Sequence, residues 1–270
     1  MNRARALATL AYVAISVSCV APARAAGTAE PAQDSDQTLR AMRDEMARSK
    51  TRLELKIPGT DQPVRPYYVE YRLLDLDIRE IVAEFGTLVS STQGRNRFMN
   101  VEARVGGYKL DSSNFIGDES FRGFIGSQGS VGIDRDYDSL RQDLWIATDQ
   151  AFKQAVETYS RKQAYLSSLA RQSNIDDFSQ TQPVQVIQPL VVADWSNRSW
   201  EQEAREASAT LRLFPDIYES RVTYYLVSAT EYLLTSEGTE IRTNRTYAAV
   251  EAGMNALASD GMPLNHLYAE

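Results

Sequence analysis

The sequence predicts an α+β protein, in which antiparallel meander sheets pack against a long amphipathic helix and further helices lie before and between the strand runs. Three observations lead to this fold class. Apolar residues recur at helical spacing after residue 36 and again after about residue 138, and they alternate with period two in residues 67–105. The predicted order is helix, strands, long helix, helix and strands, which differs from the alternating β-α-β units of a parallel sheet.

The first helix is predicted to begin at Asp36, whose side chain can cap its amino terminus. It should end before residues 58–59 (Pro-Gly), because proline lacks the backbone N–H that a helix interior needs. The apolar stripe of this helix consists of Leu39, Met42, Met46 and Leu53.

Strands are predicted in residues 67–73, 81–89 and 99–105, where apolar and polar residues alternate. Their polar faces carry glutamate and arginine, so we expect an antiparallel meander with one face in water. Turns are predicted at residues 75–77 (Asp-Leu-Asp) and 93–96 (Gln-Gly-Arg-Asn), because these residue types favour turns.

The clearest helix is predicted to begin near Asp136 or Asp138 and to end at about Ala170, and it should cover the apolar face of the sheet. The glycine-rich residues 117–132 before it are predicted to form a mobile loop. The stripe of the helix consists of Leu140, Leu144, Ala147, Ala151, Ala155, Tyr159, Leu166 and Leu169.

The second half of the chain repeats the combination of a helix with strands. A short strand is predicted in residues 184–192, and a helix in residues 195–214 is ended by Pro215. Strands are predicted in residues 222–226, 232–235 and 241–254, with a turn at residues 237–238 (Glu-Gly).

The first residues have the features of a signal peptide. Arg3 and Arg5 precede an apolar run in residues 6–20, and residues 23–25 (Ala-Arg-Ala) match the pattern that signal peptidase cleaves, so we expect residues 1–25 to be removed. The run is too short for a retained membrane anchor, which needs about 20 residues. A lipoprotein would use Cys19, but Ser16 stands where a lipobox has leucine. We therefore expect export to the periplasm or the extracellular space.

The mature chain would be acidic and would lack cysteine. Residues 1–25 contain three arginines, no acidic residue and the one cysteine, so the formal net charge changes from −7 to −10 on their removal. This charge argues against nucleic acid as a partner, and no membrane contact is expected after cleavage. We expect a flexible leader in residues 26–35, an α+β region in residues 36–262 with two sub-halves (36–172 and 183–262), and a truncated tail in residues 263–270.

No catalytic, cofactor-binding or metal-binding residues are predicted in this chain. His266 is the one histidine, whereas a zinc site usually needs two or three imidazole or thiolate ligands and a serine triad needs a positioned histidine. The glycine-rich residues 126–132 give Ser130 no nucleophile elbow, because Gln128 replaces its first glycine. A carboxylate-based hydrolase has no sequence feature in its favour.

Acidic residues near the long helix have the spacing that begins an EF-hand calcium loop, Asp134, Asp136 and Asp138. The later positions do not fit, because Ser139 stands in place of glycine and Trp145 in place of glutamate. Helix capping explains these acids better. The close pairs Asp75 with Asp77 and Glu201 with Glu203 are predicted to be solvated.

Seven segments together resemble the amino-terminal half of the TldD/PmbA family of predicted metallopeptidases, specifically its exported relatives. Their order and spacing, in combination with a signal peptide, carry the resemblance, which covers most of residues 36–262. The segments are residues 39–48 (LRAMRDEMAR), 67–72 (YYVEYR), 86–91 (GTLVSS), 101–111 (VEARVGGYKLD), 138–145 (DSLRQDLW), 236–240 (SEGTE) and 258–262 (ASDGM).

The resemblance implies an α+β domain that is followed by a larger β-rich domain, and dimers in which one partner carries an H-E-x-x-x-H zinc motif. This motif is absent here. Either the zinc-bearing domain lies beyond Glu270 and the chain is truncated, or the chain resembles the zinc-free PmbA-like partner. The enzyme class therefore stays open, since the family is a metallopeptidase family and the chain has no zinc ligands.

Two functional hypotheses follow. The first is the non-catalytic amino-terminal domain of an exported TldD/PmbA-like metallopeptidase, which contributes contacts to a homo- or hetero-dimer and to a peptide. Zinc would then lie in the missing second domain, and an available sheet edge would suit an extended peptide. The alternative is a free-standing exported binding or scaffold protein that kept the fold without protease activity.

Overall fold

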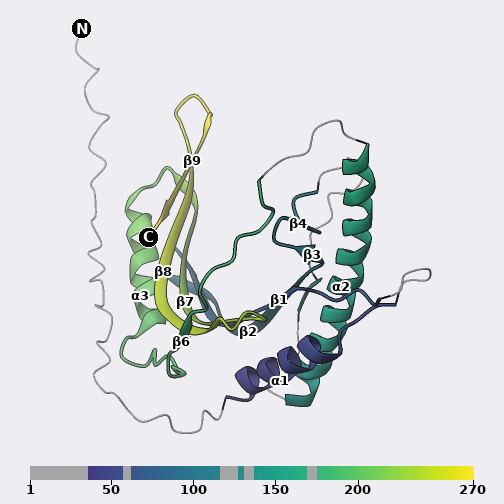
Figure 1. Ribbon diagram of the computed structural model, residues 1–270. Helices are drawn as coiled ribbons and strands as arrows, with labels where there is room; N and C mark the ends of the chain where they lie inside the picture. Colours follow the sequence, from purple (N-terminus) through teal and green to yellow (C-terminus); the bar gives the residue numbers. More distant parts are fainter. Residues whose placement is uncertain (1–35, 57–61, 116–126, 131–136, 169–174) are drawn as a thin grey trace. The chain divides into compact units, whose positions relative to one another are not determined.

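The computed structural model describes residues 36–56, 62–115, 127–130, 137–168 and 175–270 (Figure 1). Asp36–Glu270 form one compact unit. The predicted signal peptide and leader lie outside the described residues. Within the described part of the chain, no helix has the length and apolar character needed to cross a membrane.

The fold class is confirmed, because antiparallel strands pack against helices. The main sheet has seven strands in the order β5-β2-β1-β7-β8-β6, in which β6 pairs with one end of β8 and β9 with the other end. All pairs are antiparallel except β6 with β8. The strands of this sheet are β1 (Tyr68–Glu84), β2 (Thr87–Arg104), β5 (Ser127–Ser130), β6 (Gln185–Ile187), β7 (Ile217–Thr235), β8 (Glu240–Leu257) and β9 (Pro263–Ala269). A small separate hairpin consists of β3 (Gly106–Gly107) and β4 (Leu110–Asp111).

The first helix, α1 (Gln37–Arg52), begins as the sequence predicts. Asp36 Oδ1 accepts hydrogen bonds from the backbone N–H groups of Thr38 (2.9 Å) and Leu39 (3.3 Å). Asp36 Oδ2 also accepts hydrogen bonds from Tyr232 Oη (2.9 Å) and Arg242 Nη1 (2.8 Å). The residue that starts α1 therefore also ties the helix to β7 and β8.

The two turns predicted within the first strand region are wrong. Residues 75–77 and 93–96 lie in the middle of the long strands β1 and β2, where Asp75 pairs with Arg97 and Asp77 with Arg95. The hairpin instead turns at Phe85 and Gly86, which have positive φ values of 42° and 79°. The cross-strand partners outweigh the local preference of aspartate and asparagine for turns.

The carboxy-terminal strands are also longer than predicted. β7 continues through residues 227–231, where we expected a break, and β8 begins at Glu240. The predicted turn at residues 237–238 is confirmed, and Gly238 has the positive φ of 104° that glycine tolerates best. Residues 263–269 of the predicted tail form β9.

The long helix is confirmed as α2 (Tyr137–Ser167). Its stripe faces inward over the first turns, since Leu140, Leu144, Ala147, Ala151 and Ala155 are all buried. Part of the predicted glycine-rich loop is wrong, because residues 127–130 form β5 and pair with residues 98–101 of β2. The rest of that loop lies outside the described residues.

The segment between α2 and β7 differs from the prediction. The expected strand in residues 184–192 is reduced to β6, and the expected helix begins five residues late, as α3 (Trp200–Ala209) followed by the short 3₁₀ helix η1 (Thr210–Leu213). Residues 188–195, which we call the strap, lie between β6 and α3 without regular structure. They leave the edge of β8 and reach α3, so they cannot continue the β6 pairing.

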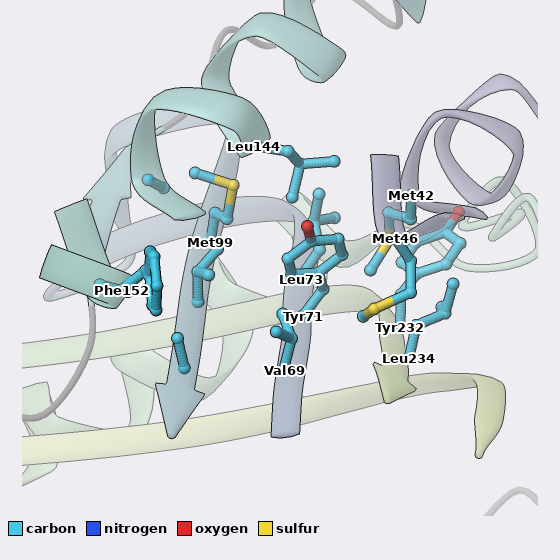
Figure 2. Close-up of a cluster of buried hydrophobic side chains, with 14 of the residues drawn as sticks. Met42, Met46, Val69, Tyr71, Leu73, Met99, Leu144, Phe152, Tyr232 and Leu234 are labelled. Carbon is cyan, nitrogen blue, oxygen red and sulfur yellow. The ribbon is translucent and has the colours of Figure 1, made fainter. Parts of the chain in front are cut away.

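Two hydrophobic clusters lie on the same face of the sheet. Leu73 and Ile81 belong to different clusters, and β1 has no register shift between them, so strict alternation places both on one face. The first cluster joins α1 and α2 to β1, β2 and β7, as Figure 2 shows for Met42, Leu144 and their neighbours. The second joins α3 to β1 and β7 through Trp200, Ala204, Ile81 and Leu226.

We expect Leu144→Ala to lower the free energy of unfolding by about 2–5 kcal/mol, because it removes a side chain with no exposed surface from the first cluster. Urea denaturation would measure the change. Leu213→Ala is the matched control, since Leu213 is 78% exposed and its truncation should cost little. Equal effects of the two substitutions would contradict the assigned packing of α2.

Candidate functional site

A central polar band lies between the two hydrophobic clusters on the helix-covered face of the sheet. The alternation that directs Leu73 and Ile81 to this face directs the residues between them to it as well. Three successive positions of this face on β1, three on β2 and two on β7 are therefore polar rather than apolar. The band consists of Asp75, Asp77, Arg79, Gln93, Arg95, Arg97, Ser228 and Thr230.

The centre of the band is a buried ion pair. The Arg97 side chain is 1% exposed and the Asp75 side chain 10%, and Arg97 Nη2 donates a 2.8 Å hydrogen bond to Asp75 Oδ2. Arg97 Nε and Nη1 have no hydrogen-bond partner among the described residues. Removing Asp75 would leave an uncompensated buried guanidinium, which is costly.

The strap crosses this band and encloses a cleft of about 400 Å³. At one end, Arg242 Nε donates to Gln188 O (2.8 Å) and Asn244 Nδ2 donates to Pro189 O (2.7 Å). At the other end, Trp200 Nε1 donates to Trp195 O (2.9 Å). The cleft lies between the strap and the strands, and its lining residues are Asp75, Asp77, Gln93, Arg95, Val191, Val192, Ala193, Trp195, Ser228 and Thr230.

A second polar cluster surrounds Asp111 in the small hairpin. Asp111 has no exposed surface, and its carboxylate accepts hydrogen bonds from Tyr67 Oη (2.7 Å), Arg104 Nη1 (3.2 Å) and Ser113 N and Oγ. Burial opposes ionisation, but the hydrogen bonds from Ser113 and Tyr67 and the charge of Arg104 outweigh it, so the pKa of Asp111 is lowered. Every group here is engaged, which indicates a structural role.

Two carboxylates on the face of the sheet opposite the helices lie directly across from each other. Glu70 pairs with Glu102 in the β1–β2 register. Burial, followed by repulsion from Glu70, raises the pKa of Glu102 against the opposing attraction of Arg104. Arg72 and Arg104 bind the two carboxylates, at 2.5 and 2.6 Å. The two ion pairs account for this pair structurally.

The opposite face of the sheet carries an apolar groove of about 720 Å³. Leu74, Phe98, Leu233 and Ile241 contribute its apolar part, and Phe98 is 49% exposed. The strand pattern predicts one apolar face and one polar face. In the middle of β1 this prediction fails, because the helix-covered face is polar there and the opposite face is apolar.

The residues singled out in the sequence do not come together. His266 is exposed on β9, opposite Met254, and Asp75 and Asp77 lie within β1 rather than in a turn. Glu201 and Glu203 lie in the first turn of α3 and form ion pairs with Arg79 and Arg198.

The candidate nucleophile and one residue of the candidate calcium loop lie in regular secondary structure. Asp138 lies in the first turn of α2, as the capping interpretation predicts, whereas Asp134 and Asp136 lie outside the described residues. The backbone of Ser130 is part of β5. Among the residues that the structure describes, no group of three or more His, Cys, Asp or Glu side chains could hold a metal ion.

These features define a class of α+β module, in which one long, mainly antiparallel sheet carries three helices on a single face. Comparison with solved structures assigns this fold to TldD/PmbA-family proteins. A protein described as a modulator of DNA gyrase from Bacteroides thetaiotaomicron matches with a TM-score of 0.51 and 11% identity, over 87% of this chain and 45% of that chain. The resemblance read from the sequence is therefore confirmed at the level of the fold.

Two further solved structures are similar but more distant. A protein described as a modulator of a DNA gyrase from Thermotoga maritima has a TM-score of 0.45 and 10% identity, over 86% of this chain and 42% of that one. TldE from Thermococcus kodakarensis has a TM-score of 0.40 and 8% identity, over 85% and 43%. This chain spans less than half the length of each of the three. No protein-family model matches the sequence, and no curated protein matches it.

We expect Asp111→Asn to destabilise the protein at pH 7 by about 1–3 kcal/mol, because Arg104 and the other donors lose a buried carboxylate. Since the folded pKa lies below the ordinary value of 3.8, the carboxylate stabilises the fold above about pH 4. This contribution is lost as the pH falls through the folded pKa. The difference in urea midpoint between the variant and the native protein should therefore narrow below pH 4. Asp216→Asn, at an exposed position, is the control and should change little at any pH; a constant difference for Asp111→Asn would contradict the assignment.

Proposed function

We propose that this chain is the non-catalytic amino-terminal module of an exported TldD/PmbA-like metallopeptidase, and that it contributes dimer and peptide contacts. The observation that carries the proposal is the fold match, in which almost the whole of this chain corresponds to 45% of a longer protein. A module of this size would leave the chemistry to a second domain. The proposal also includes export, which rests on the amino-terminal sequence alone.

Zinc does not fit the residues described here. A zinc site needs three or four nitrogen, sulfur or carboxylate ligands that converge. His266 lies exposed on β9, and the described acidic residues form no group of three or more that could hold a metal ion. In the proposal the zinc ligands belong to the second domain, and no step of the chemistry involves this module.

Peptide contact is supported by the outer edge of β2 in residues 87–97, with which no described residue pairs. Ser236 N donates to Val69 O (2.8 Å), so odd-numbered residues of β1 direct their peptide groups toward β7 and even-numbered ones toward β2. In an antiparallel ladder the paired residues share this alternation. Odd-numbered residues of β2, such as Ser91 and Gln93, therefore direct their N–H and C=O groups away from the sheet.

This edge lacks the usual protection. β5 pairs with residues 98–101 of β2, and among the described residues nothing pairs with the outer edge of residues 87–97. The segment contains no proline and no lysine, and Gly94 has open space at its Cβ position. Natural edge strands usually carry such protective features, so an extended segment can add here as a further strand.

The opposite edge of the sheet, formed by β8, has fewer unpaired backbone groups for a peptide to bind. β6 and β9 pair with the two ends of β8, and Gln188 Oε1 accepts a 3.0 Å hydrogen bond from Asn244 N between them. Thr246 and Ala248 then present the remaining outward N–H groups. The β2 edge is the better docking position for a peptide because its free segment is longer.

The alternative is a free-standing exported binding or scaffold protein. The two hydrophobic clusters form a core without a second domain, which favours this alternative. The DNA downstream of the last codon distinguishes the two. A reading frame with the rest of the family domain, particularly H-E-x-x-x-H, would support the module, and its absence would support the free-standing protein.

We expect purified residues 26–270 to contain no stoichiometric zinc and to show no peptidase activity that a chelator abolishes, because the zinc ligands are assigned to another domain. Elemental analysis after dialysis and a fluorogenic peptide assay with and without a chelator would test this. One zinc ion per chain would overturn the assignment of the metal site to a second domain.

We expect an extended peptide to bind along β2 and Ser91→Pro to weaken that binding about tenfold, because proline removes an outward N–H that the ladder with β1 does not use. Fluorescence anisotropy with a labelled ten-residue threonine/valine peptide would measure affinity. Thr246→Pro, which removes an outward N–H from the β8 edge, is the matched control.

N-methylation of alternate residues of the peptide tests strand addition at β2 by changing the peptide instead of the protein. Strand addition uses every second peptide amide, so methylation of one alternate set should abolish binding and methylation of the other should preserve it. Equal effects of both sets, or equal effects of the two proline variants, would exclude strand addition at β2.

A further inference from the structure

The cleft under the strap contains two groups of opposite charge, Asp77 and Arg95, whose hydrogen-bonding capacity the described residues only partly fill. Asp77 and Arg95 lie directly opposite each other in the β1–β2 register and both line the cleft. Opposite charges at facing positions normally form a pair. Here Arg95 lies nearest to a different carboxylate, Asp75, at 3.8 Å between Nη2 and Oδ1, and its guanidinium donates no hydrogen bond within the described part of the chain.

The nearby groups do not satisfy these two charges. Asp75 is already balanced by buried Arg97, through the 2.8 Å hydrogen bond. Asp77 Oδ1 accepts one hydrogen bond, from Gln93 Nε2 (2.9 Å). The Arg95 guanidinium and the second oxygen of Asp77 are therefore the groups that a ligand can engage.

The balance of charge selects the ligand class. An anion bound to Arg95 would lie close to the Asp77 carboxylate, and a cation bound to Asp77 would lie close to the Arg95 guanidinium. Like charges at this separation are unfavourable. A molecule with one positive and one negative group meets both partners, and each of its charges then lies next to an opposite charge.

The rest of the lining combines polar residues of the strands with apolar residues of the strap. Ser228 and Thr230 contribute hydroxyl groups, and the backbone of residues 190–193 in the strap makes no hydrogen bond to the described residues. Both ends of the strap are held by hydrogen bonds, to Asn244 and to Trp200. Its volume of about 400 Å³ is near the lower end of the roughly 300–1,000 Å³ found for small-molecule sites.

We propose that this cleft binds a small zwitterion, a free α-amino acid or a dipeptide, with its ammonium group on Asp77 and its carboxylate on Arg95. The binding is separate from strand addition at β2, because a dipeptide is too short to form a ladder. Failure of one proposal therefore leaves the other intact.

Isothermal titration calorimetry of the purified chain with alanyl-alanine tests the proposal. We expect measurable binding, and at least about tenfold weaker binding of acetyl-alanyl-alanine, which lacks the ammonium group, and of alanyl-alaninamide, which lacks the carboxylate. Arg95→Gln and Asp77→Asn should each weaken alanyl-alanine binding about tenfold, equivalent to about 1.4 kcal/mol.

Matched controls change the same charges elsewhere. Arg245→Gln and Glu231→Gln alter exposed residues on the opposite face of the sheet and should leave the affinity unchanged. Circular dichroism would establish that all four variants are folded. Absence of binding, equal binding of the blocked dipeptides, acetate or phosphate binding as tightly as alanyl-alanine, or equal effects of the control variants would each overturn the zwitterion site.

Discussion

Leu73 and Ile81 lie on the same face of β1 because the register with β2 and β7 runs without a shift between them. This single constraint decides where the helices can pack. α1 and α2 must cover the end of the sheet that contains Leu73, and α3 must cover the end that contains Ile81. The polar band between them, with its buried Arg97, lies on the same face because of the same alternation, and Arg79 at its end forms an ion pair with Glu201 of α3.

Local sequence patterns predicted the helices well and the strand ends poorly. α1 and α2 could be predicted because a cap and an apolar stripe are visible within one segment. The aspartates of β1 have the chemistry of a turn, and their arginine partners lie about twenty residues away on β2. The sequence of β1 alone does not contain Arg97, whose positive charge stabilises Asp75 in the middle of the sheet.

The candidate site was less accessible to prediction than the fold. The sequence predicts that Asp75 and Asp77 are solvated, because the strap residues that line the cleft beside them lie more than a hundred positions later. Residues 188–192 of the strap fall within the strand predicted in residues 184–192, because valine favours that structure. Glu70 and Glu102 face each other because of the β1–β2 register. That register depends on the position of the hairpin turn, which the local sequence does not reveal.

The position of β1 between β2 and β7 has a consequence for how the chain folds. β2 follows β1 directly, but Ile78 pairs with Val227, which is synthesised only after α2, β6 and α3. Until then one edge of β1 has no partner, and contacts so distant in sequence form slowly. A nascent chain of this protein therefore exposes a long, partly apolar strand edge for the time needed to make its second half, and this interval is when association with other chains competes most strongly with folding.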